Sequence, residues 1–210
     1  MGISVNDSKL SELARLISDW PGLVSGSADE LIEDSLVLLD HLGEARRLVD
    51  VGSGGGLPGL ALEITRPDLA VTLIEADQAK AAFLVQACAK LDLRDVEVLA
   101  RRAEEVGRDG RYRESFDVAV ARALAPMPAL VELCLPLVRV GGRLLAQKTD
   151  AEALEGARRA IELLGGELES VATTPSTIRR SGTVVAVAKV RATPPAYPRR
   201  PGVPGRKPLA

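Results

Sequence analysis

Short runs of apolar residues alternate with longer helical patterns through most of the chain. The runs are rich in Val, Leu and Ala and are bounded by polar or turn-forming residues, as is typical of buried strands. We expect strands at Arg47–Val51, Ala70–Glu75, Val96–Ala100, Phe116–Ala121, Gly142–Gln147, Glu167–Thr174 and Thr183–Val190. Apolar residues at helical spacing predict intervening helices at Pro58–Arg66, Gln78–Leu91, Met127–Val138 and Ala151–Leu164. This alternation predicts a parallel sheet with helices on both faces.

The two ends of this region carry different patterns. Residues 7–19 and 28–42 form predicted amphipathic helices ahead of the first strand. Only residues 175–182 separate the last two strands, and a link that short permits an antiparallel hairpin but no parallel crossover. The pattern therefore predicts an α/β fold: a mostly parallel seven-stranded sheet with an antiparallel last strand and a short N-terminal helical segment.

Patterning and composition divide the chain into three parts. Residues 1–44 are the N-terminal helical segment, residues 45–192 hold the predicted sheet and form the main domain, and residues 193–210 are a basic, proline-rich tail. Because proline lacks a backbone N–H and has a fixed φ, we expect the tail to form neither a regular helix nor a central strand.

The composition narrows the class of protein. A chain of 210 residues with 46% hydrophobic and 2% aromatic residues builds one α/β domain whose core is packed by Leu, Val and Ala. No apolar run approaches the length that spans a bilayer, and the N-terminal sequence MGISVNDSKL has no signal-peptide pattern. We therefore expect a cytoplasmic protein, and we expect a monomer.

Two rare residue types exclude several kinds of active site. His41 is the only histidine, so the chain cannot build a Ser-His-Asp or Cys-His site or a His-rich metal site. Cys88 and Cys134 lie far apart in helix-like apolar segments, which predicts buried packing residues rather than a disulfide or a metal pair. We expect no metal.

Charge is distributed unevenly along the chain. The net charge is −2, yet no acidic residue follows Glu169, so the segment from Val171 onward carries +8 and the rest of the chain −10. A basic end on an acidic body suggests a polyanion bound at one face. The alternative is a solvated, poorly ordered tail.

The stretch from Asp50 to Gly59, DVGSGGGLPG, joins a predicted strand to a predicted helix. A dinucleotide fingerprint, G-x-G-x-x-G, fits Gly52 and Gly54 but fails at Leu57. Asp50 has no role in that fingerprint, but it opens the D-x-G-x-G-x-G loop of S-adenosylmethionine (SAM) methyltransferases. Because SAM carries cationic groups and no pyrophosphate, a carboxylate beside the loop is favourable. The antiparallel last strand also indicates the class I SAM-methyltransferase (Rossmann-like) sheet, since nicotinamide-binding sheets stay parallel.

Three further strand ends should meet this loop, because ligands of open α/β sheets bind at the carboxyl ends of the strands. Glu75 ends the second strand and suits the ribose hydroxyls, whereas Asp77 is better explained as a helix cap. Ala103 and Glu104 follow the third strand and are placed to contact adenine. Arg122 follows the fourth strand and contacts the ligand or, alternatively, neutralises a carboxylate of the site.

The segment after the fourth strand also excludes two methylation chemistries. It contains no Asn/Asp-Pro-Pro-Tyr/Phe motif, which enzymes acting on exocyclic amines of adenine commonly use. Methylation of pyrimidine C5 usually needs a Pro-Cys nucleophile, and Cys134 is preceded by Leu133.

With these motifs in place, the chain resembles the bacterial 16S rRNA guanine-N7 methyltransferase family, RsmG, also called glucose-inhibited division protein B. The resemblance runs from about Trp20 to Leu209. It rests on Asp34-Ser35-Leu36, Asp50 to Gly59, Arg66-Pro67, Phe116-Asp117, Arg122-Ala123, Lys148 and the tail from Pro195 to Pro204. The Leu-Pro-Gly after the glycine loop and the Tyr-Pro-Arg-Arg of the tail are specific in combination.

The resemblance implies methyl transfer from SAM to N7 of a guanine in the decoding-region loop of 16S rRNA, with that RNA or a small-subunit precursor as partner. The family pattern implies SAM contacts at Gly52, Leu57, Ala103, Glu104 and Arg122. To these the motif analysis adds Asp50, Gly54 and Glu75. We expect Arg122 and Lys148 to act at the catalytic face, because each follows a predicted buried strand. We expect Arg199, Arg200, Arg206 and Lys207 to contact RNA phosphates and to contribute little to SAM binding.

The chain also departs from the family pattern, in ways that bear on RNA binding more than on SAM binding. Leu31 replaces a usual His, Ala79-Lys80 replaces Lys/Arg-Arg, Gly182-Thr183 replaces Arg-His, and Thr149 replaces Gly. Two alternatives therefore stay open: a SAM methyltransferase for another RNA position or a small molecule, and a non-catalytic SAM-binding, ribosome-associated protein.

Overall fold

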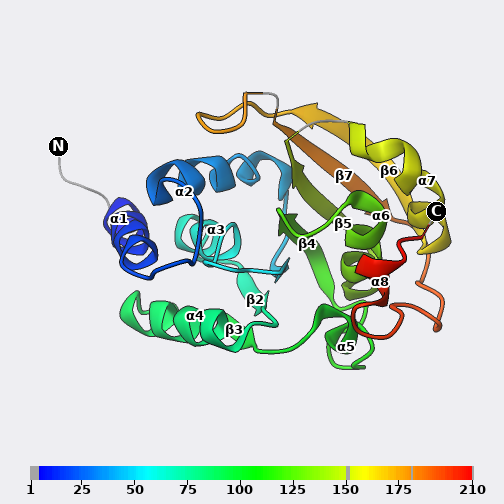
Figure 1. Ribbon diagram of the computed structural model, residues 1–210, viewed down its shortest axis with the longest axis horizontal. Helices are drawn as coiled ribbons and strands as arrows, with labels where there is room; N and C mark the ends of the chain where they lie inside the picture. The colour runs from blue at the N-terminus through cyan, green and yellow to red at the C-terminus, as the bar shows by residue number, and fades with distance from the viewer. Residues whose placement is uncertain (1–4, 150–151, 181, 210) are drawn as a thin grey trace.

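The computed structural model describes residues 5–149, 152–180 and 182–209, and its centre is one seven-stranded sheet in the order β3-β2-β1-β4-β5-β7-β6 (Figure 1). The strands are β1 Arg47–Val51, β2 Ala70–Ile74, β3 Val96–Leu99, β4 Phe116–Arg122, β5 Val138–Lys148, β6 Gly166–Thr173 and β7 Thr183–Lys189. β7 runs antiparallel to both of its neighbours, and the remaining pairs are parallel. The predicted fold class is confirmed, including the antiparallel last strand.

Helices cover both faces of the sheet, as the buried strands require. One face carries α1 Val5–Ser18, α2 Ala28–Leu36, α3 Gly59–Thr65 and α4 Gln78–Lys90, and the other carries α5 Ala103–Val106, α6 Met127–Cys134 and α7 Arg158–Leu163 (Figure 1). Successive strand residues point to opposite faces, so Leu48 lies in the first core and Val49 in the second. No helix in the described ranges is long and apolar enough to cross a membrane.

Three helices are shorter in the structure than the ranges that their apolar patterns predicted. The expected helix over 28–42 ends at Leu36 and is followed by the 3-10 turn η1, Leu39–His41. α6 stops at Cys134, because Pro136 cannot continue the hydrogen-bond ladder, and η2, Leu135–Leu137, leads directly into β5. The expected helix from Ala151, a position outside the described residues, consists of η3 Glu152–Ala157 and α7.

The tail differs from the sequence expectation. It packs on the body and contains one helical turn, α8 Val203–Arg206, beside α6 (Figure 1). Pro204 is tolerated because the first turn of a helix needs no N–H partner. The tail backbone is held by arginines of the body: Arg113 donates to the carbonyl oxygens of Thr193 (2.7 Å) and Tyr197 (2.8 Å), and Arg108 donates to that of Pro198 (2.6 Å). The tail is therefore folded onto the body of the protein, and it contains a four-residue helical turn that the sequence analysis did not predict.

Candidate functional site

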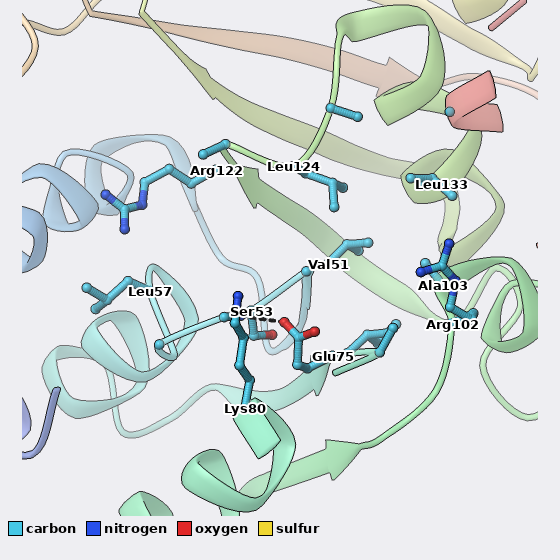
Figure 2. A pocket seen from close by; sticks show the side chains of 18 of the residues that line it. Val51, Ser53, Leu57, Glu75, Lys80, Arg102, Ala103, Arg122, Leu124 and Leu133 are labelled. Carbon is cyan, nitrogen blue, oxygen red and sulfur yellow. Dashed lines mark hydrogen bonds between the residues drawn. The ribbon is translucent and has the colours of Figure 1, made fainter. Parts of the chain in front are cut away.

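A cavity of about 750 Å³ opens at the carboxyl ends of β1 to β4, where the strand order reverses. The loops that follow these four strands line it, with help from the link before α2 and from the tail (Figure 2). Ligands of open α/β sheets bind at such a switch point. The volume lies within the range of pockets for small molecules and cofactors.

The glycine loop presents bare backbone to this cavity. Gly52 has φ 76° and Gly54 has φ 53°, a left-handed conformation that glycine adopts without strain. A Cβ built on Gly54 would meet only the Gly52 carbonyl oxygen, at 3.9 Å, so this side of the loop is open. A Cβ on Gly52 would lie 2.5 Å from Leu124 Cδ1, so this glycine lets the loop after β4 approach closely. Leu57 also lines the cavity.

Glu75 stands beside the glycine loop at the end of β2 (Figure 2). Its Oε2 accepts a hydrogen bond from the Gly54 N–H at 2.8 Å, and its Oε1 accepts one from the Asp77 N–H at 2.8 Å. Each carboxylate oxygen keeps a second acceptor position, which matches the two hydroxyls of a ribose. Glu75 is thus held in place before a ligand arrives.

Asp50 occupies a different position from the one the motif suggested. Its side chain is fully buried and does not line the cavity. Oδ2 accepts a hydrogen bond from the Gly59 N–H at 2.9 Å, while Oδ1 has no hydrogen-bond partner among the described residues. Burial raises the pKa of Asp50 to about 7, against the hydrogen bond from Gly59. The structure therefore does not bring the Asp50 carboxylate to the cavity wall, where we expected it, and places it beneath the turn into α3.

Arg122 ends β4, lines the cavity and points toward α2, away from Ala103 (Figure 2). Its Nη1 lies 3.7 Å from Asp34 Oδ2. Burial lowers the pKa of Arg122, and the carboxylates of Asp34 and Asp50 oppose that shift. Arg122 remains a cation, since guanidinium does not lose its proton in proteins. The side chain therefore places positive charge on the cavity wall at the β4 side.

Asp34 joins Arg122 to the link between β6 and β7. Its carboxylate is completely buried, and Oδ1 accepts hydrogen bonds from Arg179 Nε at 2.6 Å and from Ser176 Oγ at 2.6 Å. Oδ2 faces Arg122 and has no hydrogen-bond partner within the described part of the chain. The Asp34-Ser35-Leu36 motif thus contributes a buried anion that two arginines share.

Lys148 lies at the end of β5, behind the wall of the cavity. Its Nζ donates to the Ala125 carbonyl oxygen at 2.8 Å, and its own carbonyl oxygen accepts from Arg179 Nη1 at 2.5 Å. Ala125 lines the cavity, whereas Lys148 does not. The structure brings Lys148 to the expected edge of the sheet and ties it to the loop after β4.

At the β3 side, Ala103 and Glu104 both line the cavity. Glu104 is 4% exposed, and its Oε1 accepts a hydrogen bond from the Gly202 N–H of the tail at 2.7 Å. Its Oε2 lies 3.7 Å from Arg102 Nε. The Glu104 side chain therefore binds the tail. The small side chain of Ala103 leaves space beside this part of the cavity wall, and a flat ring fits such a space.

The four basic tail residues do not form one surface. Arg199 makes a bidentate ion pair with buried Glu132, with Nη2 to Oε2 at 2.6 Å and Nε to Oε1 at 2.9 Å. No acidic residue follows Glu169 in the sequence, but the fold brings Glu132, on α6, against Arg199. Arg200 and Lys207 are exposed, and Arg206 lines the cavity.

Several residues that line the cavity were not among the predicted site residues. Lys80 reaches from α4 toward the glycine loop, beside Ser53 and Glu75 (Figure 2). The others lie in the link before α2, on α2, on α6 and in the tail: Leu23, Val24, Leu31, Leu133, Gly202 and Gly205. An apolar residue at a helical position is ordinarily read as core, so only the packing of these segments identifies them. Leu31, where the resembling family has His, gives this part of the wall an apolar surface.

Sequence comparison matches the chain to one family of methyltransferases. The family model GidB, described as rRNA small subunit methyltransferase G, matches residues 24–181. Ribosomal RNA small subunit methyltransferase G of Moorella thermoacetica is 46% identical over 184 residues, which cover 84% of this chain and 75% of that protein. The protein of the same name from Acetivibrio thermocellus is 34% identical over 226 residues, covering 99% and 92%.

Solved structures share the fold at low sequence identity. The O-methyltransferase TomG from Streptomyces achromogenes, solved in complex with SAM, has a TM-score of 0.61 at 23% identity and covers 87% of this chain and 90% of its own. The ribosomal protein L11 methylase from Lactobacillus delbrueckii has a TM-score of 0.60 at 16% identity, covering 81% and 83%. These similarities concern the fold alone.

Proposed function

The chain belongs to the rRNA small subunit methyltransferase G family, and from this premise we propose that it transfers a methyl group from SAM to N7 of a guanine in the decoding-region loop of 16S rRNA. The observation that carries the proposal is the cavity at the switch point, where open glycine backbone faces a fixed carboxylate. The substrate is the rRNA, free or within a small-subunit precursor, in the cytoplasm.

The residues of the cavity fit SAM part by part. Gly54 leaves room for the methionine portion against the backbone, Gly52 lets the loop after β4 close over it, and Glu75 accepts the ribose hydroxyls. Ala103, one strand further out, lies where adenine follows the ribose. Bound SAM supplies an electrophilic methyl group on its sulfonium.

Guanine N7 carries a lone pair and no proton, so the reaction needs no general base. The protein has to align N7 with the methyl group, which is catalysis by proximity. Arg122 at the β4 side is placed to orient the guanine or the methionine carboxylate, and Lys148 positions the loop that follows Arg122 through Ala125. This division of roles makes Arg122 a candidate catalytic residue and Lys148 a positioning residue.

Mass mapping of methylated guanosine in 16S rRNA tests the proposal. Purified protein, SAM and ribosomal RNA or small subunits from a strain without the enzyme should yield one new 7-methylguanosine, located in the decoding-region loop. Gly54→Ala is the matched negative control, because its Cβ projects into the cavity at a left-handed backbone position. Methyl groups at another position of the RNA, or none on either substrate, would overturn the proposal.

A further inference from the structure

The C-terminal turn Gly202–Arg206 forms part of the cavity wall. Gly202, Gly205 and Arg206 line the cavity together with Ala103 and Leu133. Figure 2 shows this turn, the red ribbon, on the same side as Ala103 and opposite Arg122. The turn therefore lies at the end of the cavity that holds Ala103 and Leu133, away from the glycine loop and Arg122.

Two buried carboxylates hold the turn in that position. Glu104, on α5, accepts the Gly202 N–H at 2.7 Å, and Glu132, on α6, binds the guanidinium and the backbone N–H of Arg199. Arg199 Nη2 also donates to the Lys207 carbonyl oxygen at 2.8 Å, so one side chain spans the turn from its start to its end. Glu104 is 4% exposed and Glu132 is 0% exposed. A buried carboxylate without its partner costs free energy of unfolding, so these two side chains favour the single position of the turn in which both are paired.

Arg206 lies against Gly202 at the rim of this wall. A Cβ built on Gly202 would stand 3.0 Å from Arg206 Nη1, so the glycine lets the guanidinium fold flat over the backbone. Gly202 has φ 77°, which a side chain would strain. A planar guanidinium stacks favourably on aromatic rings, and adenine is the ring expected at this side of the cavity.

We propose that the C-terminal turn is part of the cofactor site: it closes the adenosine end of the cavity, and Arg206 contacts the adenine. The inference rests on the proposed function for the identity of the ligand. It assigns Arg206 to cofactor binding rather than to the RNA backbone. It also makes SAM binding dependent on a segment more than a hundred residues beyond the glycine loop.

Calorimetry with S-adenosylhomocysteine and with adenosine alone tests the inference. Arg206→Ala should weaken both ligands, by about tenfold, since the contact is with their shared adenine. Gly205→Val should weaken both as well. A Cβ at Gly205, which lines the cavity, meets no atom within 4 Å, so we expect the fold to accept the side chain and the side chain to take up space in the cavity. Arg191→Ala is the control, an exposed arginine that lies outside the cavity.

The outcomes separate the inference from the proposed function. Native affinity of both Arg206→Ala and Gly205→Val for adenosine would overturn the inference, while methylation of 16S rRNA by the wild-type protein would leave the function standing. A wild-type protein that binds neither ligand would overturn the function itself. Equal thermal unfolding of Gly205→Val and Arg191→Ala shows that a reduced affinity is local.

Discussion

Single carboxylates decide how the site of this methyltransferase is held. Asp34, Asp50 and Glu75 are all acids of the sequence motifs, yet each does something different. Glu75 lies on the cavity, Asp50 is buried under the turn into α3, and Asp34 is buried between two arginines. Only the acid that keeps contact with the cavity is placed to bind a ligand directly. The other two act on the shape and charge of its walls.

Asp34→Asn should destabilise the protein and weaken methyl transfer. The substitution leaves Arg179, itself 9% exposed, without its buried anion, and breaking such a pair costs about 3–5 kcal/mol in free energy of unfolding. It also removes the charge that faces Arg122. Denaturant unfolding measures the loss of stability. The control is Glu33→Gln, an exposed neighbour on α2, which should lie within about 0.5 kcal/mol of wild type. Equal midpoints for both variants would exclude this role.

Asp50 should make the stability of the protein depend on pH. Its pKa is 3.8 when unperturbed and about 7 in the folded protein, so the folded state binds more protons between these values. The free energy of unfolding therefore falls as pH rises from about 4 to about 7, by on the order of 4 kcal/mol, and this contribution is constant outside the window.

Asp50→Asn removes this titration and keeps an acceptor for the Gly59 N–H. Relative to wild type, the variant should gain melting temperature steadily as pH rises from 4 to 7. Scanning calorimetry of both proteins at matched pH values measures the difference. Two curves that stay parallel through this window contradict the assignment.

At the scale of elements, the tail is the segment whose role changed most. Its prolines argued against regular secondary structure, but the arginines of the body and the carboxylates of α5 and α6 fold it onto the domain. α8 forms because its proline falls in the first turn of the helix. The tail consequently has one side on the cavity, where Arg206 lies, and another side exposed to solvent, where Arg200 lies.

Arg199→Gln and Arg200→Gln should have unequal effects on stability, although they are neighbours in the same motif. Removing Arg199 leaves Glu132 buried and unpaired, at a cost of about 3 kcal/mol, the low end for such pairs because Arg199 is partly exposed. For a domain of this size that loss lowers the melting temperature by roughly 10 °C. Arg200→Gln should change it by less than about 2 °C. Circular dichroism during thermal unfolding measures both melting temperatures. Equal shifts for the two variants would mean that the ion pair contributes nothing to stability.

At the scale of the whole molecule, much of the charge asymmetry is internal. The basic end of the chain lies on the acidic body, where Lys189 pairs with Glu114 and Arg199 with Glu132. Burial lowers the pKa of Lys189 to about 8, against the attraction of Glu114. The tail is therefore neither a bare strip for RNA nor a solvated end. The exposed outer side of the tail includes Arg200 and Lys207.

Arg200 and Lys207 should carry part of the salt dependence of RNA binding. Replacing both with Gln should reduce the log–log slope of affinity against salt by about 0.7–0.9 for each phosphate that the protein no longer neutralises, with unchanged affinity for S-adenosylhomocysteine. Fluorescence anisotropy with a 16S decoding-loop fragment at several salt concentrations measures the slope. Lys90→Gln, an exposed lysine on α4 across the sheet, is the control. An unchanged slope in the double variant places the RNA surface elsewhere.

The sequence by itself determined the order of the elements, the antiparallel last strand, the glycine loop and the family. Each of these depends on local periodicity, link length or a contiguous motif, which neighbours in the chain specify directly. The same reasoning placed Glu75, Ala103 and Arg122 on one cavity, because the carboxyl ends of parallel strands share an edge of the sheet.

Only the tertiary structure decided which charged groups meet. Glu132 and Arg199 are 67 residues apart, and Asp34 and Arg179 are 145 apart, so no local pattern relates them. The partner of a buried charge is selected by the desolvation cost of leaving it alone, and that cost depends on how helices pack and not on spacing. For the same reason the motif named Asp50, but packing placed its carboxylate off the cavity wall, and packing brought Arg206 to the cavity.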